Sequence, residues 1–133
     1  MDYIVLDTDV TSQSFKQRLP PALLARLAGR PTCITFVTHG ELTQWGVMWK
    51  WGPGRRAALA QRLAGLPILP GDKAVAEMWG RLSGAAKLRG RARPQNDTWI
   101  AACCLVYGLP LATRNVKDFR DFAEHNGLTL VTG

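Results

Sequence analysis

The chain has 133 residues, of which 47% are apolar and 20% charged, and it carries a net charge of +7. This length fits one domain, residues 1–133, with a core large enough to fold without disulfides or a structural metal, and the composition excludes a disordered chain. The basic balance favours an anionic partner such as nucleic acid, although an acidic partner protein would satisfy it equally well.

The N-terminal residues and the cysteines bear on cellular location. The sequence opens without a basic leader, and its first apolar run, residues 3–6, is too short for the core of a signal peptide. No apolar run is long enough for a membrane span. The three cysteines, Cys33, Cys103 and Cys104, lack the spacing of a disulfide framework or a zinc site. We therefore expect a cytoplasmic protein with buried thiols and no membrane partner.

The first half of the chain alternates between strand and helix patterns. Apolar and β-branched runs predict strands at residues 3–6, 32–37 and 68–69, and helical patterns are found at residues 22–27, about 39–50 and 55–63. A short helix before residue 20 is expected to be capped by Thr11 or Ser12. Thr38 stands three residues before Glu41, which is capping-box spacing and predicts that Glu41 lies in the first turn of its helix.

The second half continues the same alternation. We expect helices at about residues 73–89, 95–107 and 116–124, and strands at residues 109–113 and 128–131. Strands that alternate with helices predict an α/β fold, here a three-layer α/β/α sandwich around a mostly parallel sheet. In such folds, functional side chains gather at the carboxyl ends of strands and at the adjacent helix starts.

Acidic side chains occupy those positions. Asp7 follows the first strand, Glu41 follows the second, and Asp97 lies in the first turn of an apolar helix. Taken singly, each carboxylate could simply stabilise a helix end. Together they provide the oxygen ligands that Mg²⁺ prefers, and such an ion can activate water for attack on a phosphodiester. Asn115 and Asp118 follow the strand that ends at Thr113 and point to the same edge of the sheet.

Other catalytic schemes fit the sequence less well. His39 stands two residues from Glu41, and such neighbours do not share a helix face. His125, beside Asn126-Gly127, indicates a surface turn. Gly52-Pro53-Gly54 lacks the Lys-Ser/Thr ending of a phosphate-binding loop.

Four sequence blocks carry a family resemblance. They are residues 6–10 (Leu-Asp-Thr-Asp-Val), 38–41, 96–102 (Asn-Asp-Thr-Trp-Ile-Ala-Ala) and 108–119. In their order and spacing along nearly the whole chain, these blocks resemble PIN-domain ribonucleases, specifically the VapC-type toxins of bacterial type II toxin–antitoxin systems. The last two blocks are the most specific.

The resemblance implies a function and a set of partners. It implies a toxin that is a Mg²⁺-dependent, or Mn²⁺-dependent, endoribonuclease, acting on an RNA substrate. It also implies a cognate VapB-type antitoxin that covers or invades the active site, and a homodimer.

The resemblance also implies roles for individual residues. Asp7, Glu41 and Asp97 match the acids of the family, and the fourth position falls at Asn115, where the family often has Asp, or at Asp118. Asp7 and Asp97 would hold the ion, and Glu41 would bind it through water or orient the attacking water. Further candidates to contact or support the ligands are Thr8, Thr113 and Asp9, where the family usually has Asn.

Basic and aromatic residues are candidates for RNA contact. The best candidates are Arg89, Arg91, Arg93 and Arg114, with Arg55, Arg56 and Lys87 as others, and each could instead lie on a solvated helix face. Trp45, Trp49 and Trp51 could stack on bases, but we favour their packing against a partner, and we place the antitoxin groove or the dimer contact at residues 42–66.

Three alternatives remain open at this point. Asn115 in place of an acid favours a catalytically weakened PIN module that binds RNA or protein. A structure-specific DNA nuclease would use the same acids. A metal-dependent phosphatase for small substrates is the third, and the positive charge weighs against it.

Overall fold

Five short strands form a parallel sheet at the centre of the molecule. The computed structural model describes residues 2–133, and the strands in this part of the chain are β1 (Ile4–Leu6), β2 (Thr32–Thr35), β3 (Ile68–Leu69), β4 (Leu111–Ala112) and β5 (Leu130–Val131). They pair in the order β3-β2-β1-β4-β5, and every pairing is parallel.

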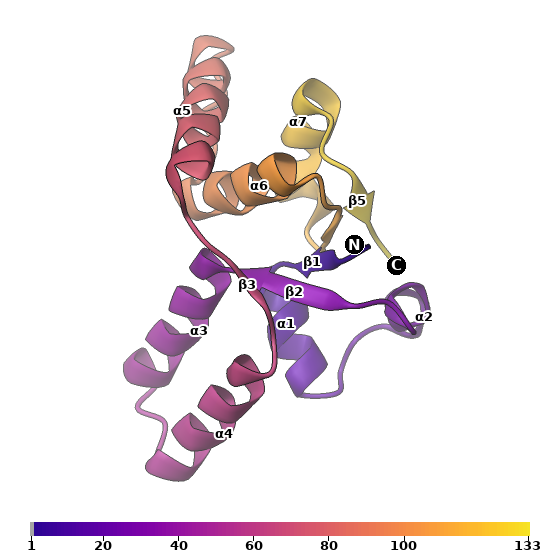
Figure 1. Ribbon diagram of the computed structural model, residues 1–133, viewed down its shortest axis with the longest axis vertical. Coiled ribbons are helices and arrows are strands. Elements are labelled where there is room, and N and C mark those ends of the chain that lie inside the picture. Colours follow the sequence, from indigo (N-terminus) through magenta and orange to yellow (C-terminus); the bar gives the residue numbers. More distant parts are fainter. Residues whose placement is uncertain (1) are drawn as a thin grey trace.

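Helices cover both faces of this sheet. In chain order they are α1 (Thr8–Phe15), α2 (Pro21–Leu27), α3 (Phe36–Met48), α4 (Pro53–Ala64), α5 (Lys73–Leu88), α6 (Gln95–Tyr107) and α7 (Val116–Asn126). Figure 1 shows α5, α6 and α7 on one side of the sheet and α1 to α4 on the other. The predicted three-layer α/β/α sandwich is therefore confirmed.

Alternating side chains of the strands supply two separate cores. Val5 and Cys33 point toward the core shared with α5, α6 and α7. Their neighbours Ile4 and Ile34 point to the opposite face, into the core shared with α1 to α4. Successive side chains of a strand point to opposite faces, so a central strand covered by helices on both sides must be apolar at every position. This requirement explains the unbroken apolar run of β1.

The strand order determines where a ligand site can form. From β1 the chain proceeds to β2 and β3 on one side, and later returns to place β4 and β5 on the other. The helical connections therefore diverge at the carboxyl ends of β1 and β4, leaving a crevice there. Asp7 directly follows β1, and Thr113 directly follows β4.

Two helices begin earlier than the sequence predicted. Asp7 is the N-cap of α1, so the predicted caps Thr11 and Ser12 lie inside that helix. Thr35 is the N-cap of α3, and its hydroxyl accepts a hydrogen bond from the Thr38 amide at 3.3 Å. Both predictions were wrong for one reason. An apolar run that passes directly from strand into buried helix shows no break in its pattern.

The early start of α3 changes the position of Glu41. Thr38 is inside the helix and is not its cap, so the predicted capping box does not form. Glu41 lies in the second turn rather than the first. Its carboxylate is thereby one turn further from the sheet, which leaves it free of the helix end.

The cysteines behave as the sequence predicted, as buried free thiols. Cys33, Cys103 and Cys104 pack in or beside the core under α5 and α6. Burial raises the pKa of Cys33 to about 11 and that of Cys103 to about 12, so neither thiol ionises readily near neutral pH. Among residues 2–133, none of the helices combines the length and the hydropathy that a bilayer span requires.

Candidate active site

An acidic cavity of about 180 Å³ opens at the carboxyl ends of β1 and β4. All three predicted acids and both candidates for the fourth position line it. The lining residues are Asp7, Thr8, Asp9, Glu41, Trp45, Asp97, Ile100, Asn115, Asp118 and Phe119. Segments that lie far apart in the sequence therefore contribute carboxylates to one space.

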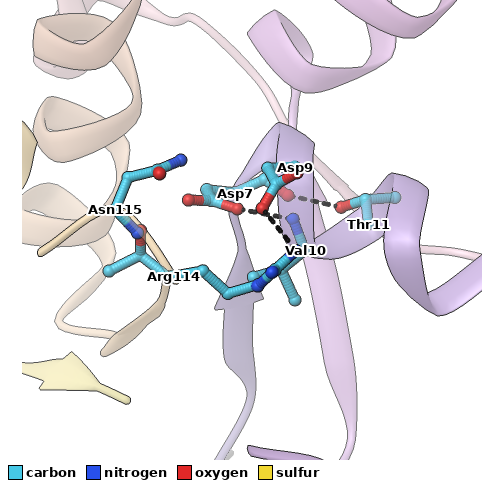
Figure 2. Close-up of polar contacts among 7 residues, drawn as sticks. Asp7, Asp9, Val10, Thr11, Arg114 and Asn115 are labelled. Carbon is cyan, nitrogen blue, oxygen red and sulfur yellow. Dashed lines mark hydrogen bonds and ion pairs between the residues drawn. The ribbon is translucent and has the colours of Figure 1, made fainter. Parts of the chain in front are cut away.

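Asp7 both caps α1 and faces this cavity. One of its carboxylate oxygens accepts a 2.7 Å hydrogen bond from the Val10 amide, and its backbone carbonyl accepts one from the Thr11 hydroxyl at 2.7 Å. The side chain is only 3% exposed. Figure 2 shows the Asp7 carboxylate lying between the start of α1 and the side chain of Asn115. The two interpretations of Asp7, as cap and as candidate ligand, are thus compatible.

Glu41 is held by a threonine pair. The Thr8 hydroxyl donates to Oε1 of Glu41 at 2.7 Å and lies 2.9 Å from the Thr38 hydroxyl. Thr8 has a single hydroxyl proton and gives it to Glu41, so Thr38 must donate to Thr8. Thr8 therefore supports an acidic side chain, as proposed from the sequence. Thr38 extends the chain of hydrogen bonds, a role that the sequence interpretation missed.

The remaining acids lie at helix starts. Asp97 is in the first turn of α6 and Asp118 is in the first turn of α7, where the helix dipole stabilises negative charge. Asn115 is the N-cap of α7 but makes no capping hydrogen bond with its side chain. Its amide is therefore available to the cavity. Thr113 accepts a hydrogen bond from the Asn115 amide nitrogen at 2.9 Å and also bonds Asp7 through its side chain.

Crowding of carboxylates perturbs the titration of two of them. Burial raises the pKa of Asp7 to about 6, the charges of Asp9 and Glu41 add to that effect, and hydrogen bonds from Thr113 and Val10 oppose it. Burial also raises the pKa of Asp97 to about 6, with further contributions from Asp118, Glu41 and Asp7. These mutual effects mean that the acids repel one another across the cavity, as the sequence interpretation expected in the absence of a cation.

Comparison with known proteins places the chain in a family. A family model described as PIN domain matches residues 4–125. The chain belongs to the PIN-domain family. Ribonuclease VapC4 of Mycobacterium tuberculosis is 37% identical over 116 residues, which cover 80% of this chain and 81% of that protein. VapC ribonuclease Y4jK of Sinorhizobium fredii is 30% identical over 138 residues, covering 96% of this chain and 95% of the relative.

Solved structures share the PIN-domain fold. VapBC-1 from nontypeable Haemophilus influenzae aligns with a TM-score of 0.80 at 24% identity, covering 98% of this chain and 96% of that one. VapBC-5 from Mycobacterium tuberculosis, a member of a family of toxin–antitoxin systems, aligns with a TM-score of 0.75 at 28% identity over the full length of both chains. The resemblance read from the sequence is therefore confirmed.

The donor set of this PIN domain fits a hydrated magnesium ion. Within the described residues, no three His, Cys, Asp or Glu side chains converge closely enough to hold an ion on their own. Mg²⁺ does not need such a cage, because it keeps several waters and is commonly bound by one or two carboxylates. The repulsion among the acids also favours a cation. Asp7 and Asp97, both with a raised pKa, are the best candidates for direct contact.

The predicted RNA-binding arginines mostly make contacts within the protein. Arg89 pairs with the buried Asp121 at 2.7 Å, Arg93 donates to the backbone carbonyl of Asp118 at 3.3 Å, and Arg114 pairs with Asp9 at 3.4 Å. The Arg114–Asp9 pair lies at the rim of the cavity, where both side chains are partly exposed (Figure 2). The Asp9 charge is thus partly neutralised, and Asp9 is not the cap of α1. Arg91 is exposed.

The histidines lie outside the acidic cavity. His39 lines a different groove, between α3 and α4. His125 is in the last turn of α7 rather than in the predicted turn, and its imidazole lies 3.6 Å from the carboxylate of Asp121. Neither side chain can act on a substrate bound between the acids.

Sequence reasoning did not identify the apolar lining of the cavity. Trp45, Ile100 and Phe119 contribute to its walls. The spacing of Trp45, four residues after Glu41, was the available signal, because residues at that spacing share a helix face.

Proposed function

We propose that this protein is the toxin of a type II toxin–antitoxin pair and a divalent-metal-dependent endoribonuclease. The single observation that carries the proposal is the acidic cavity, in which Asp7, Glu41, Asp97 and Asp118 line one space at the edge of the sheet. Its setting in a PIN-domain chain supports the same activity, as does 37% identity to a protein named as a ribonuclease. The net charge of +7 favours RNA as the substrate, and the cytoplasm is where the enzyme would meet it.

The side chains divide the work of phosphodiester hydrolysis. Asp7 and Asp97 would hold Mg²⁺, with Mn²⁺ as a possible substitute. When bound, the ion lowers the pKa of water and takes up charge on the scissile phosphate. Glu41, oriented by the Thr8 hydroxyl, positions the attacking water or binds the ion through an intervening water. Asn115 and Asp118 are the candidates to complete the site.

The proposal is tested by cleavage of single-stranded RNA with Mg²⁺ or with a chelator. We expect Asp97→Asn to lower the cleavage rate at least a hundredfold and the chelator to abolish cleavage. Glu77→Gln, which removes an exposed carboxylate on α5, is the matched control and should retain wild-type activity. Cleavage that persists in Asp97→Asn or in the chelator would refute the assignment. A parallel assay on flap DNA distinguishes a ribonuclease from a structure-specific DNA nuclease.

The groove between α3 and α4 is our candidate for antitoxin binding. It has a volume of about 400 Å³, and its apolar lining includes Val47, Leu59, Leu63 and Ile68. Val47 is 61% exposed and Ile68 is 41% exposed, as expected for side chains that a partner covers. Val47→Asp should weaken the complex with a VapB-type antitoxin while RNA cleavage by the free toxin stays unchanged. Unaltered complex formation would place the antitoxin elsewhere. We also propose a homodimer, which mass measurement in solution tests.

A further inference from the structure

A stripe of side chains leads out of the acidic cavity along one face of α3. Glu41, Trp45 and Trp49 are spaced four residues apart, which places them one above another on the helix. Glu41 and Trp45 line the cavity, and the Trp45 and Trp49 rings stack with centroids 5.2 Å apart. From Glu41 to Trp49 the stripe extends about 12 Å along the helix axis. Figure 1 shows α3 running from the end of β2 away from the sheet.

The loop after α3 continues the stripe. The Trp51 ring lies 5.9 Å from the Trp49 ring, and the Arg55 guanidinium lies 3.8 Å above the Trp51 ring. Trp51 folds back against Gly46, where a Cβ atom would meet its ring at 3.4 Å. The absence of a side chain at Gly46 therefore allows the ring to lie close to α3. Trp45, Trp49 and Trp51 together form what we call the indole ladder.

The ladder combines exposed aromatic surface with positive charge. Trp49 is 55% exposed, although an indole normally buries most of its surface. Residues 42–71 contain no Asp or Glu and carry four cationic side chains, Lys50, Arg55, Arg56 and Arg62. Aromatic platforms interleaved with cations are the means by which proteins bind single-stranded nucleic acid, because bases stack on the rings while cations neutralise phosphates.

The proposed antitoxin groove lies on a different face of the same helix. His39, Thr43 and Val47 line that groove, whereas Glu41 and Trp45 line the acidic cavity. Successive residues of a helix are separated by about 100° around its axis, so these two sets point in different directions. The two faces can therefore serve two partners.

We propose that the indole ladder, with Lys50 and Arg56 beside it, binds the unpaired nucleotides of an RNA strand whose scissile bond lies in the acidic cavity. The inference rests on the proposed ribonuclease function and specifies the substrate as single-stranded RNA. Bases adjacent to the cleavage point stack along Trp45 and Trp49, and the cations contact their phosphates. Duplex RNA keeps its bases paired and stacked on one another, so it cannot use the ladder.

The test measures binding without cleavage. A fluorescein-labelled single-stranded RNA of mixed sequence is titrated with protein in a chelator, and its fluorescence anisotropy gives Kd. We expect Trp49→Ala to raise Kd about tenfold, as for the loss of one base–aromatic stack, and Trp49→Phe to restore most of the affinity. Met48→Ala is the matched control, because Met48 is 58% exposed beside a Trp49 that is 55% exposed. It should stay within about twofold of wild type.

The outcomes separate this inference from the proposed function. Unchanged RNA affinity in Trp49→Ala overturns the ladder, and so does an equal loss for duplex RNA. If Trp49→Ala impairs only antitoxin binding, the ladder is a protein contact and the inference is also wrong. Selective loss of single-strand affinity supports it. That result stands even if Asp97→Asn retains full cleavage, in which case the nuclease assignment fails and the binding track remains.

Discussion

The Thr8 hydroxyl donates a 2.7 Å hydrogen bond to the Glu41 carboxylate and thereby joins the start of α1 to the second turn of α3. Thr8→Val keeps the shape of the side chain but removes this donor and leaves the buried Thr38 hydroxyl without its acceptor. We expect a loss of about 1–2 kcal/mol in the free energy of unfolding. RNA cleavage should fall about tenfold, because Glu41 is no longer oriented.

Thr43→Val is the control for this prediction. Thr43 is an exposed residue of α3 whose hydroxyl bonds only to the backbone carbonyl of His39 in its own helix. Urea titrations and single-turnover rates should leave it close to wild type. Equal rates for Thr8→Val and wild type would show that the threonine pair has no part in positioning Glu41.

Replacement of Asp7 by Asn should stabilise the metal-free protein near neutral pH. The pKa of Asp7 is raised to about 6 by burial, above its ordinary value of 3.8, so the folded state binds this proton more tightly than the unfolded state. In wild type, the resulting stability is fully present below about pH 4 and is lost as pH rises through about 6. Asn cannot ionise, and it caps a helix as well as Asp does.

The measurement is thermal unfolding of both proteins in a chelator across this pH range. At about pH 8, Asp7→Asn should be more stable by about 2 kcal/mol, because each unit of pKa shift corresponds to about 1.4 kcal/mol. At about pH 4 the two proteins should unfold alike. An Asn variant that is no more stable at about pH 8 would contradict the origin assigned to the raised pKa.

Arg89 should matter for stability and Arg91 for RNA binding. The Arg89–Asp121 pair is short, at 2.7 Å, and the Asp121 side chain is 7% exposed. Arg89→Met leaves that buried carboxylate with only the more distant His125 and should cost about 2–3 kcal/mol. Arg91 is exposed, so Arg91→Met should change stability by less than about 0.5 kcal/mol.

RNA binding at several salt concentrations gives the second measurement on these arginines. If Arg91 contacts a phosphate, Arg91→Met should reduce the slope of log K against log salt by about one. Arg89→Met should leave the slope unchanged, provided that the measurement is made well below its unfolding temperature. A reduced slope for Arg89→Met alone would reverse the two roles.

Asp118 rather than Asn115 should supply the fourth acidic function. Both line the cavity, but only the Asp118 charge contributes to the raised pKa of Asp97. Asp118→Asn should lower Mg²⁺-dependent cleavage at least tenfold and raise the Mg²⁺ concentration at half-maximal rate. Asn115→Ala removes a side chain that makes no capping bond, so the fold should be retained. A larger rate loss in Asn115→Ala than in Asp118→Asn would assign the position to Asn115.

The sequence predicted the architecture well because the architecture depends on local patterns. Apolar runs that alternate with helical spacing specified the α/β class, and the strands at residues 3–6 and 68–69 lie close to their observed positions. The errors fell at Asp7 and Thr35, where a strand passes directly into a helix. At those points the apolar pattern continues without interruption, and the N-cap is defined only by backbone geometry.

The acids of the site could be found from their positions after strands, whereas their supports could not. Thr8 and Glu41 are 33 residues apart, and Arg89 and Asp121 are 32 apart. Nothing in local spacing indicates that such residues will meet. The arginines therefore all seemed equally free for RNA in the sequence, and the structure assigns Arg89 and Arg93 to contacts within the protein.

By itself the sequence determined the alternation of strands and helices, the excess of positive charge and the identity of the acids that follow the strands. The tertiary structure alone decided that Thr8 orients Glu41, that Arg89 pairs with Asp121, and that Trp45 belongs to the wall of the acidic cavity. The physical reason is one of range. Periodicity and turn preference act between neighbours, but a hydrogen bond or an ion pair forms only where folding has brought distant segments within a few ångströms.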